Sequence, residues 1–217
     1  MNTFSLAREH PPKDGLTIST GAGFTSVHGV TYFSLGKNTD ISAEKYSSPI
    51  MLIGSYGQGE VVFGNDSNAP RKSIASGEFT ALRPNSLFGT AAKNDGFIYT
   101  EVMVKGDIIM NENVKTGEVF ALKDLLDFEK GSIVNMDVAR SSTMKFVVMA
   151  FDAGTGLSPH SAPGDALIFA LDGEGIIGYE GKEHKIKAGE NFRFAKGGLH
   201  SVKAVTPFKM ALLLTLE

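Results

Sequence analysis

Short apolar or β-branched runs alternate with polar turn residues over most of the chain. The runs span about four to eight residues and are separated by glycine, proline, asparagine and aspartate, which is the pattern of strands and turns in a sandwich or barrel. Residues 178–186 predict a hairpin that turns at Glu180, Gly181 and Lys182. The pattern therefore predicts an all-β protein.

One stretch departs from this rhythm. Residues 120–128 place apolar side chains at Leu122, Leu125 and Leu126, which is helical spacing over about two turns. The polar stretch 111–117 comes just before it. We therefore expect a short linking helix and two domains, 1–115 and 116–217.

The two halves of the chain resemble each other. Residues 31–35 match 147–151, residues 50–59 match 166–175, and residues 97–104 match 208–215. The first half carries extra residues around 65–70. A repeat this long indicates duplication of a whole domain, because solenoid repeats are only about 20–50 residues long.

Composition narrows the function classes. The chain has 217 residues, 25 glycines and a net charge of -3. It has no cluster of lysine and arginine of the kind that nucleic-acid binding requires. Because cysteine is absent, disulfides, thiolate metal sites and cysteine nucleophiles are excluded. No run reaches the roughly 18 apolar residues of a membrane span, and the start of the chain does not resemble a signal peptide. We therefore expect a soluble, cytoplasmic protein without membrane or nucleic-acid partners.

Two short motifs in the last third of the chain each contain a histidine. Residues 156–166 carry His160, and residues 189–200 carry His200. With their glycines and Pro159, these motifs resemble the cupin superfamily, in a two-barrel form of the cupin 2 conserved-barrel type. The resemblance implies two tandem jelly-roll β-barrels. It also implies a divalent metal in the barrel mouth, held by two histidines one residue apart, a glutamate and a third histidine.

This sequence departs from that ligand set at two positions. Ala162 stands at the second histidine position and Ala166, or Leu167 on the longer spacing, at the glutamate position. His160 and His200 are the family ligands that remain, so a divalent first-row metal would be held by these two. Asp165 is a candidate replacement ligand or acid/base group, and its alternative role is to cap its own turn.

The N-terminal copy lacks both histidines. Glu44 aligns with His160, Phe88 with His200, and Tyr46 with the lost second histidine. We expect this copy to bind no metal and to be either structural or a blind binding pocket.

Three function hypotheses follow. The first is a protein that binds a small polar or anionic molecule in the C-terminal barrel, in a pocket lined by His160, Ser161, Asp165 and His200. The second is a metal-dependent enzyme of the isomerase or dioxygenase type with a reduced ligand set. The third is a structural or interaction protein with two degenerate barrels. Monomer and homodimer are both compatible with the sequence, which leaves open whether the protein is an enzyme.

Overall fold

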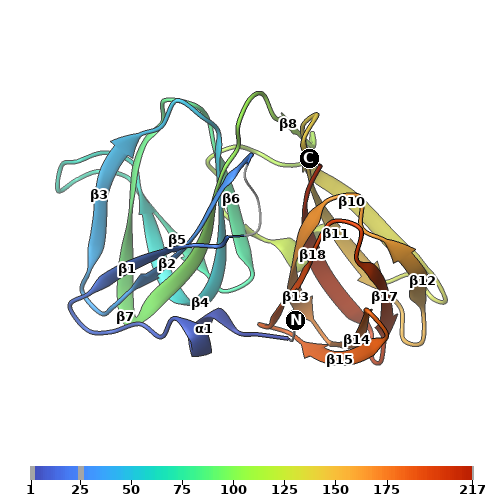
Figure 1. Ribbon diagram of the computed structural model, residues 1–217. Helices are drawn as coiled ribbons and strands as arrows, with labels where there is room; N and C mark the ends of the chain where they lie inside the picture. The colour runs from blue at the N-terminus through green and yellow to red at the C-terminus, as the bar shows by residue number, and fades with distance from the viewer. Residues whose placement is uncertain (1–2, 24–26, 217) are drawn as a thin grey trace. The chain divides into compact units, whose positions relative to one another are not determined.

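The computed structural model describes residues 3–23 and 27–216, whose regular secondary structure is almost entirely β-strand (Figure 1). Helix is limited there to α1 (Leu6–Glu9) and the 3-10 turn η1 (Leu122–Leu125). The chain divides into two compact units. The N-terminal unit contains Leu6–Ile108 and Glu112–Ala121, and the C-terminal unit contains residues 3–5, Ile109–Asn111 and 122–216.

The N-terminal unit is built on one antiparallel sheet with the strand order β1-β2-β7-β4-β6-β9. Strand β3 also pairs with β7, and β5 pairs with β4. The strands are β1 (Thr17–Gly21), β2 (Gly29–Leu35), β3 (Asp40–Lys45), β4 (Ile50–Val62), β5 (Arg71–Ala75), β6 (Glu78–Leu82), β7 (Leu87–Met103) and β9 (Phe120–Ala121). The extra residues around 65–70 lie in the connection between β4 and β5.

The C-terminal unit has two sheets, whose strands from β10 onward are yellow to red in Figure 1. Their strand orders are β16-β13-β18-β11-β10-β8 and β12-β17-β14-β15. The strands of the first sheet are β8 (Ile109–Met110), β10 (Ile133–Arg140), β11 (Met144–Phe151), β13 (Asp165–Asp172), β16 (Asn191–Phe194) and β18 (Phe208–Thr215). Those of the second are β12 (Gly156–Ser161), β14 (Glu174–Tyr179), β15 (Lys182–Lys187) and β17 (Leu199–Ala204).

The predicted hairpin is confirmed and the predicted helix is much shorter than expected. Strands β14 and β15 join through Glu180 and Gly181, which both have positive φ, at 48° and 76°. Two such residues form the turn that matches the twist of a tight hairpin. At the helix, Phe120 and Ala121 pair with β6 instead, so that only the single turn η1 remains.

Each unit has its own apolar core. The N-terminal core gathers around Phe97, Tyr99 and Ile50. The C-terminal core gathers around Phe151, Phe192 and Phe208. The predicted all-β class is confirmed, whereas the two-barrel arrangement stays a prediction because the strand order of each sheet is open among the described residues. No described helix has the length and apolar character to cross a membrane.

Candidate functional site

His160 and His200 lie side by side on neighbouring strands of the C-terminal unit. They are direct partners in the register of β12 and β17, so their side chains leave the same face of the sheet. Their ring centroids are 4.1 Å apart with an interplanar angle of 53°. The ring of Phe194 also packs against His200, with a centroid distance of 4.1 Å.

The backbone contacts of the two histidines determine which nitrogen carries the proton. Nδ1 of His160 lies 2.8 Å from the carbonyl oxygen of Ser158. Nδ1 of His200 lies 3.2 Å from the carbonyl oxygen of Gly198. Because a carbonyl oxygen can only accept, each neutral ring holds its proton on Nδ1 and leaves a lone pair on Nε2. Two hydrogen-bond acceptors are thus presented together.

Burial makes the two rings electrostatically different. His200 is only 9% exposed, whereas His160 is exposed. Burial lowers the pKa of His200, the hydrogen bond to Gly198 raises it, and the neighbouring His160 lowers it, so that the pKa lies below the usual value. Near neutral pH, His200 is therefore a neutral acceptor.

The other two predicted pocket residues have contacts of their own. Asp165 lies at the start of β13, and its carboxylate accepts a hydrogen bond of 2.8 Å from the backbone N–H of Lys196. Ser161 pairs with Leu199, one position along from the histidine pair, and side chains alternate between the two faces of a strand. The geometry groups His160 with His200, while Asp165 links the start of β13 to the turn after β16.

The residues present do not complete a metal centre. Ala162 and Ala166, which stand at the two lost ligand positions, are buried in the apolar core and offer no lone pair. Among the described residues, no group of three histidine, cysteine or acidic side chains is placed to hold a metal ion. Protein metal sites ordinarily use three or more protein ligands, and the histidine pair supplies two.

Aromatic rings continue inward from the histidine pair. Phe194 contacts Tyr179 at a centroid distance of 5.5 Å and Phe192 at 5.3 Å. His184 then packs on Phe192 at 5.0 Å. The interior behind the pair is thus filled by rings, and the polar groups gather at its edge.

A second buried polar group, Glu101 of the N-terminal unit, was not identified from the sequence. It is 7% exposed and lies in the buried part of β7. The signal was present in the sequence, because Glu101 is the one charged residue in the run 97–104.

Comparisons with known proteins find a family similarity in the C-terminal part. Residues 147–216 match the model of the cupin domain family. No curated protein sequence matches the chain. Because the family match does not extend to the N-terminal half, the two-barrel form stays a prediction.

Solved structures support the fold over the whole chain. A cupin 2 conserved barrel domain protein from Leptotrichia buccalis aligns with a TM-score of 0.84 and 25% identity, over 99% of this chain and 96% of that one. Bacillus subtilis oxalate decarboxylase aligns with a TM-score of 0.57 and 11% identity, over 99% and 77%. AerE from Microcystis aeruginosa aligns with a TM-score of 0.54 and 14% identity, over 88% and 89%. One structure of the decarboxylase concerns its Mn(II) centres.

Proposed function

We propose that the C-terminal unit, in which residues 147–216 are a cupin domain, binds a small polar molecule through His160 and His200. The observation that carries this proposal is the pair of Nε2 acceptors left by the two Nδ1 contacts to Ser158 and Gly198. A purely structural pair would not need both lone pairs to point away from the backbone. Convergent polar groups beside an apolar interior are the usual mark of a ligand site.

The protonation state of the pair selects the ligand. While both rings are neutral, Nε2 accepts hydrogen bonds, so the partner is a hydroxyl group or a protonated acid. When the rings gain protons in mild acid, Nε2 becomes a donor and the pair attracts an anion such as a carboxylate. Burial keeps the pKa of His200 below its ordinary value, so its Nε2 becomes a donor only in acid. Binding of a carboxylate should therefore strengthen as the pH falls below about 6.5, the ordinary pKa of histidine.

The alternative is a metal-dependent enzyme with a reduced ligand set. Two features favour it: the Nδ1 contacts, which resemble the backbone bonds that orient metal-ligating histidines, and the Mn(II) centres of the distantly similar decarboxylase. The small number of ligands counts against it, because the described histidine pair offers a metal only two nitrogen atoms.

The test is a histidine NMR titration on protein labelled with ¹⁵N at histidine and prepared without a polyhistidine tag or chelator. Oxalate and glycerol serve as the carboxylate and hydroxyl probes, each at pH 6 and pH 8. We expect saturable shifts at Nε2 of His160 and His200, with oxalate favoured at pH 6. His200→Ala should abolish binding, and His184→Ala, which changes a histidine of the same unit outside the pair, should leave it intact.

The metal content of the same samples separates the alternatives. If the wild type contains stoichiometric manganese, iron or zinc and His200→Ala loses it, the proposal is wrong and the metal-dependent enzyme is favoured. Absence of any saturable Nε2 shift in metal-free protein would leave the histidine pair with a packing role.

A further inference from the structure

Glu101 is a buried carboxylate without a cation beside it. Its direct neighbours across the sheet are Thr31 on β2 and Leu52 on β4, neither of which is charged. No described residue makes a hydrogen bond or ion pair with the Glu101 side chain. Burial of a carboxyl group without a partner is costly, so such a group needs an explanation.

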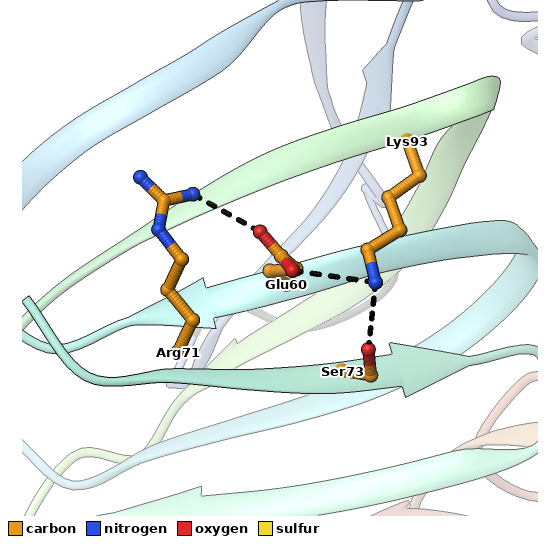
Figure 2. Close-up of polar contacts among 4 residues, drawn as sticks. All are labelled: Glu60, Arg71, Ser73 and Lys93. Carbon is orange, nitrogen blue, oxygen red and sulfur yellow. Dashed lines mark hydrogen bonds and ion pairs between the residues drawn. The ribbon is translucent and has the colours of Figure 1, made fainter.

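A second carboxylate on the same unit shows what a satisfied acidic group looks like. Glu60 on β4 lies 3.0 Å from Nη1 of Arg71 and 3.3 Å from Nζ of Lys93, which also donates to Ser73 (Figure 2). Partial burial acts to raise the pKa of Glu60, but the hydrogen bonds from Arg71 and Lys93 outweigh it and the pKa falls. At Glu101, burial and then the negative charge of Glu44 raise the pKa to about 7.

The groups around Glu101 form what we call the Glu101 cluster: Phe33, Glu44, Tyr46, Tyr99 and Glu101. The ring of Tyr99 stacks on Phe33 with centroids 5.0 Å apart, and its hydroxyl lies 3.0 Å from Oγ1 of Thr90. Burial, followed by the charges of Glu101 and Glu44, raises the pKa of Tyr46. Both phenols therefore stay neutral near pH 7, because burial also raises the pKa of Tyr99 well above its usual value.

Exposure is graded across the cluster. Glu44 at the end of β3 is exposed, Phe33 and Tyr46 are half-buried, and Tyr99 and Glu101 are buried. The cluster thus combines an outer carboxylate, aromatic rings and an inner carboxylate that no side chain neutralises.

We propose that the Glu101 cluster binds a small primary ammonium ion, whose N–H groups are accepted by Glu101 and Glu44 and whose alkyl part lies against Phe33, Tyr46 and Tyr99. A carboxylate that lacks a cation supplies the charge complement, and aromatic faces attract cations within about 6 Å of their centroids. A hard divalent cation fits less well, because calcium takes six or more oxygen ligands and the walls here are largely rings. The proposed site lies in the N-terminal unit and does not depend on His160 or His200.

The test uses the full chain and butylammonium chloride as the probe. Isotope labelling of the glutamate side-chain carboxyl carbons allows Glu101 to be followed by NMR. We expect saturable binding at pH 8 that is about tenfold weaker at pH 6, because each pH unit below the pKa of Glu101 leaves about a tenth as much ionised carboxylate.

Three titratable groups of the described residues face Glu101: Glu44 on β3, Tyr46 just after β3, and Tyr99 on the same strand as Glu101. The neighbours that β2 and β4 present to Glu101 are uncharged.

Variants and probes distinguish the proposal from its competitors. Glu101→Gln and Glu44→Gln should each weaken butylammonium binding about tenfold or more, the usual effect of losing a hydrogen bond to a charged group. Glu60→Gln removes a carboxylate that already has its cations and should leave binding unchanged. His200→Ala, which would abolish the ligand site proposed for the C-terminal unit, should also leave it unchanged.

Three results would overturn the proposal. One is the absence of saturable butylammonium binding to the wild type at pH 8. Another is equal binding of 1-butanol, which would show that only the apolar wall matters. The third is stoichiometric binding of Mn²⁺ that Glu101→Gln removes and butylammonium does not compete with, which would make the cluster a metal site.

Discussion

Buried polar side chains in this protein differ in whether a neighbouring group satisfies their hydrogen bonds or charge. His200 is enclosed by His160 and Phe194, and its Nδ1 faces a carbonyl oxygen. Glu101 has only uncharged neighbours on both flanking strands. The first arrangement stabilises a neutral ring, while the second raises the free energy of the ionised carboxylate.

Replacement of Glu101 by glutamine should make stability less dependent on pH. The folded-state pKa of Glu101 is raised to about 7, so the native state binds more protons than the unfolded chain between about pH 4.5 and 7. Stability is therefore lost as the pH rises through this window, by up to about 3 kcal/mol, and Glu101→Gln removes that loss. Urea unfolding at pH 5 and pH 8 measures it, with Glu60→Gln as the control. A constant difference between Glu101→Gln and the wild type at both pH values would contradict this assignment.

Single residues also show where the sequence was informative. The two histidines were identified because each lies in a motif, and the structure places them side by side. Glu101 was passed over because it lies in a run that matches residues 208–215, where Leu212 stands at its position. Asp165 accepts a hydrogen bond from the backbone N–H of Lys196, a long-range contact that spacing in the sequence does not reveal.

At the scale of elements, turns are fixed by backbone conformation. Gly173 and Gly181 both have positive φ, at 69° and 76°. Around Gly181 there is open space, whereas an added Cβ at Gly173 would collide with the backbone oxygen of Pro207. A side chain at Gly181 would therefore have only a conformational cost, whereas one at Gly173 would have a conformational and a steric cost.

We expect Gly181→Ala to cost about 1 kcal/mol and Gly173→Ala clearly more. Both alanines would adopt a left-handed conformation, which costs about 1–2 kcal/mol per residue, and only the second would also displace the chain before β18. Thermal unfolding of the two variants beside the wild type measures the difference. Equal losses in the two variants would mean that the backbone at Pro207 yields without cost.

Elements were predictable to the extent that their signals are local. The hairpin of β14 and β15 has its strands and its turn close together in the sequence, within residues 174–187, and the sequence predicted a hairpin there, over 178–186. The helix at 120–128 was overestimated because Phe120 and Ala121 pair with β6, about forty residues earlier in the chain. Such pairing overrides a short helical pattern, since an isolated helix of two turns is not stable in water.

At the scale of the whole molecule, the C-terminal unit is discontinuous in the sequence. Phe4 pairs with Asn191 through hydrogen bonds of 3.0 and 2.7 Å. The guanidinium group of Arg193 lies 5.0 Å from the centre of the Phe4 ring, and the hydroxyl of Thr3 donates to the carbonyl of Lys185. The start of the chain thus forms part of the unit that its last hundred residues build.

Truncation of the Phe4 side chain should destabilise the C-terminal unit. Phe4 is half-buried, so Phe4→Ala should cost about 1–3 kcal/mol, less than the loss of a fully buried phenylalanine. Hydrogen exchange of the β16 amides measures this locally, and the amides of β7 serve as an internal control. Leu16→Ala, which changes a side chain that is 51% exposed, is the matched variant. Unaltered exchange in β16 would show that the segment at residues 3–5 adds no stability.

This connectivity has a consequence for synthesis of the protein. Residues 6–121 complete the N-terminal unit, so that unit can fold while the rest of the chain is still being translated. Phe4 can pair with Asn191 only after Asn191 has left the ribosome, and β13 can pair with β18 only after β18 has left it. A nascent chain arrested near residue 190 should therefore resist protease in its N-terminal unit and be cut readily both before α1 and after η1.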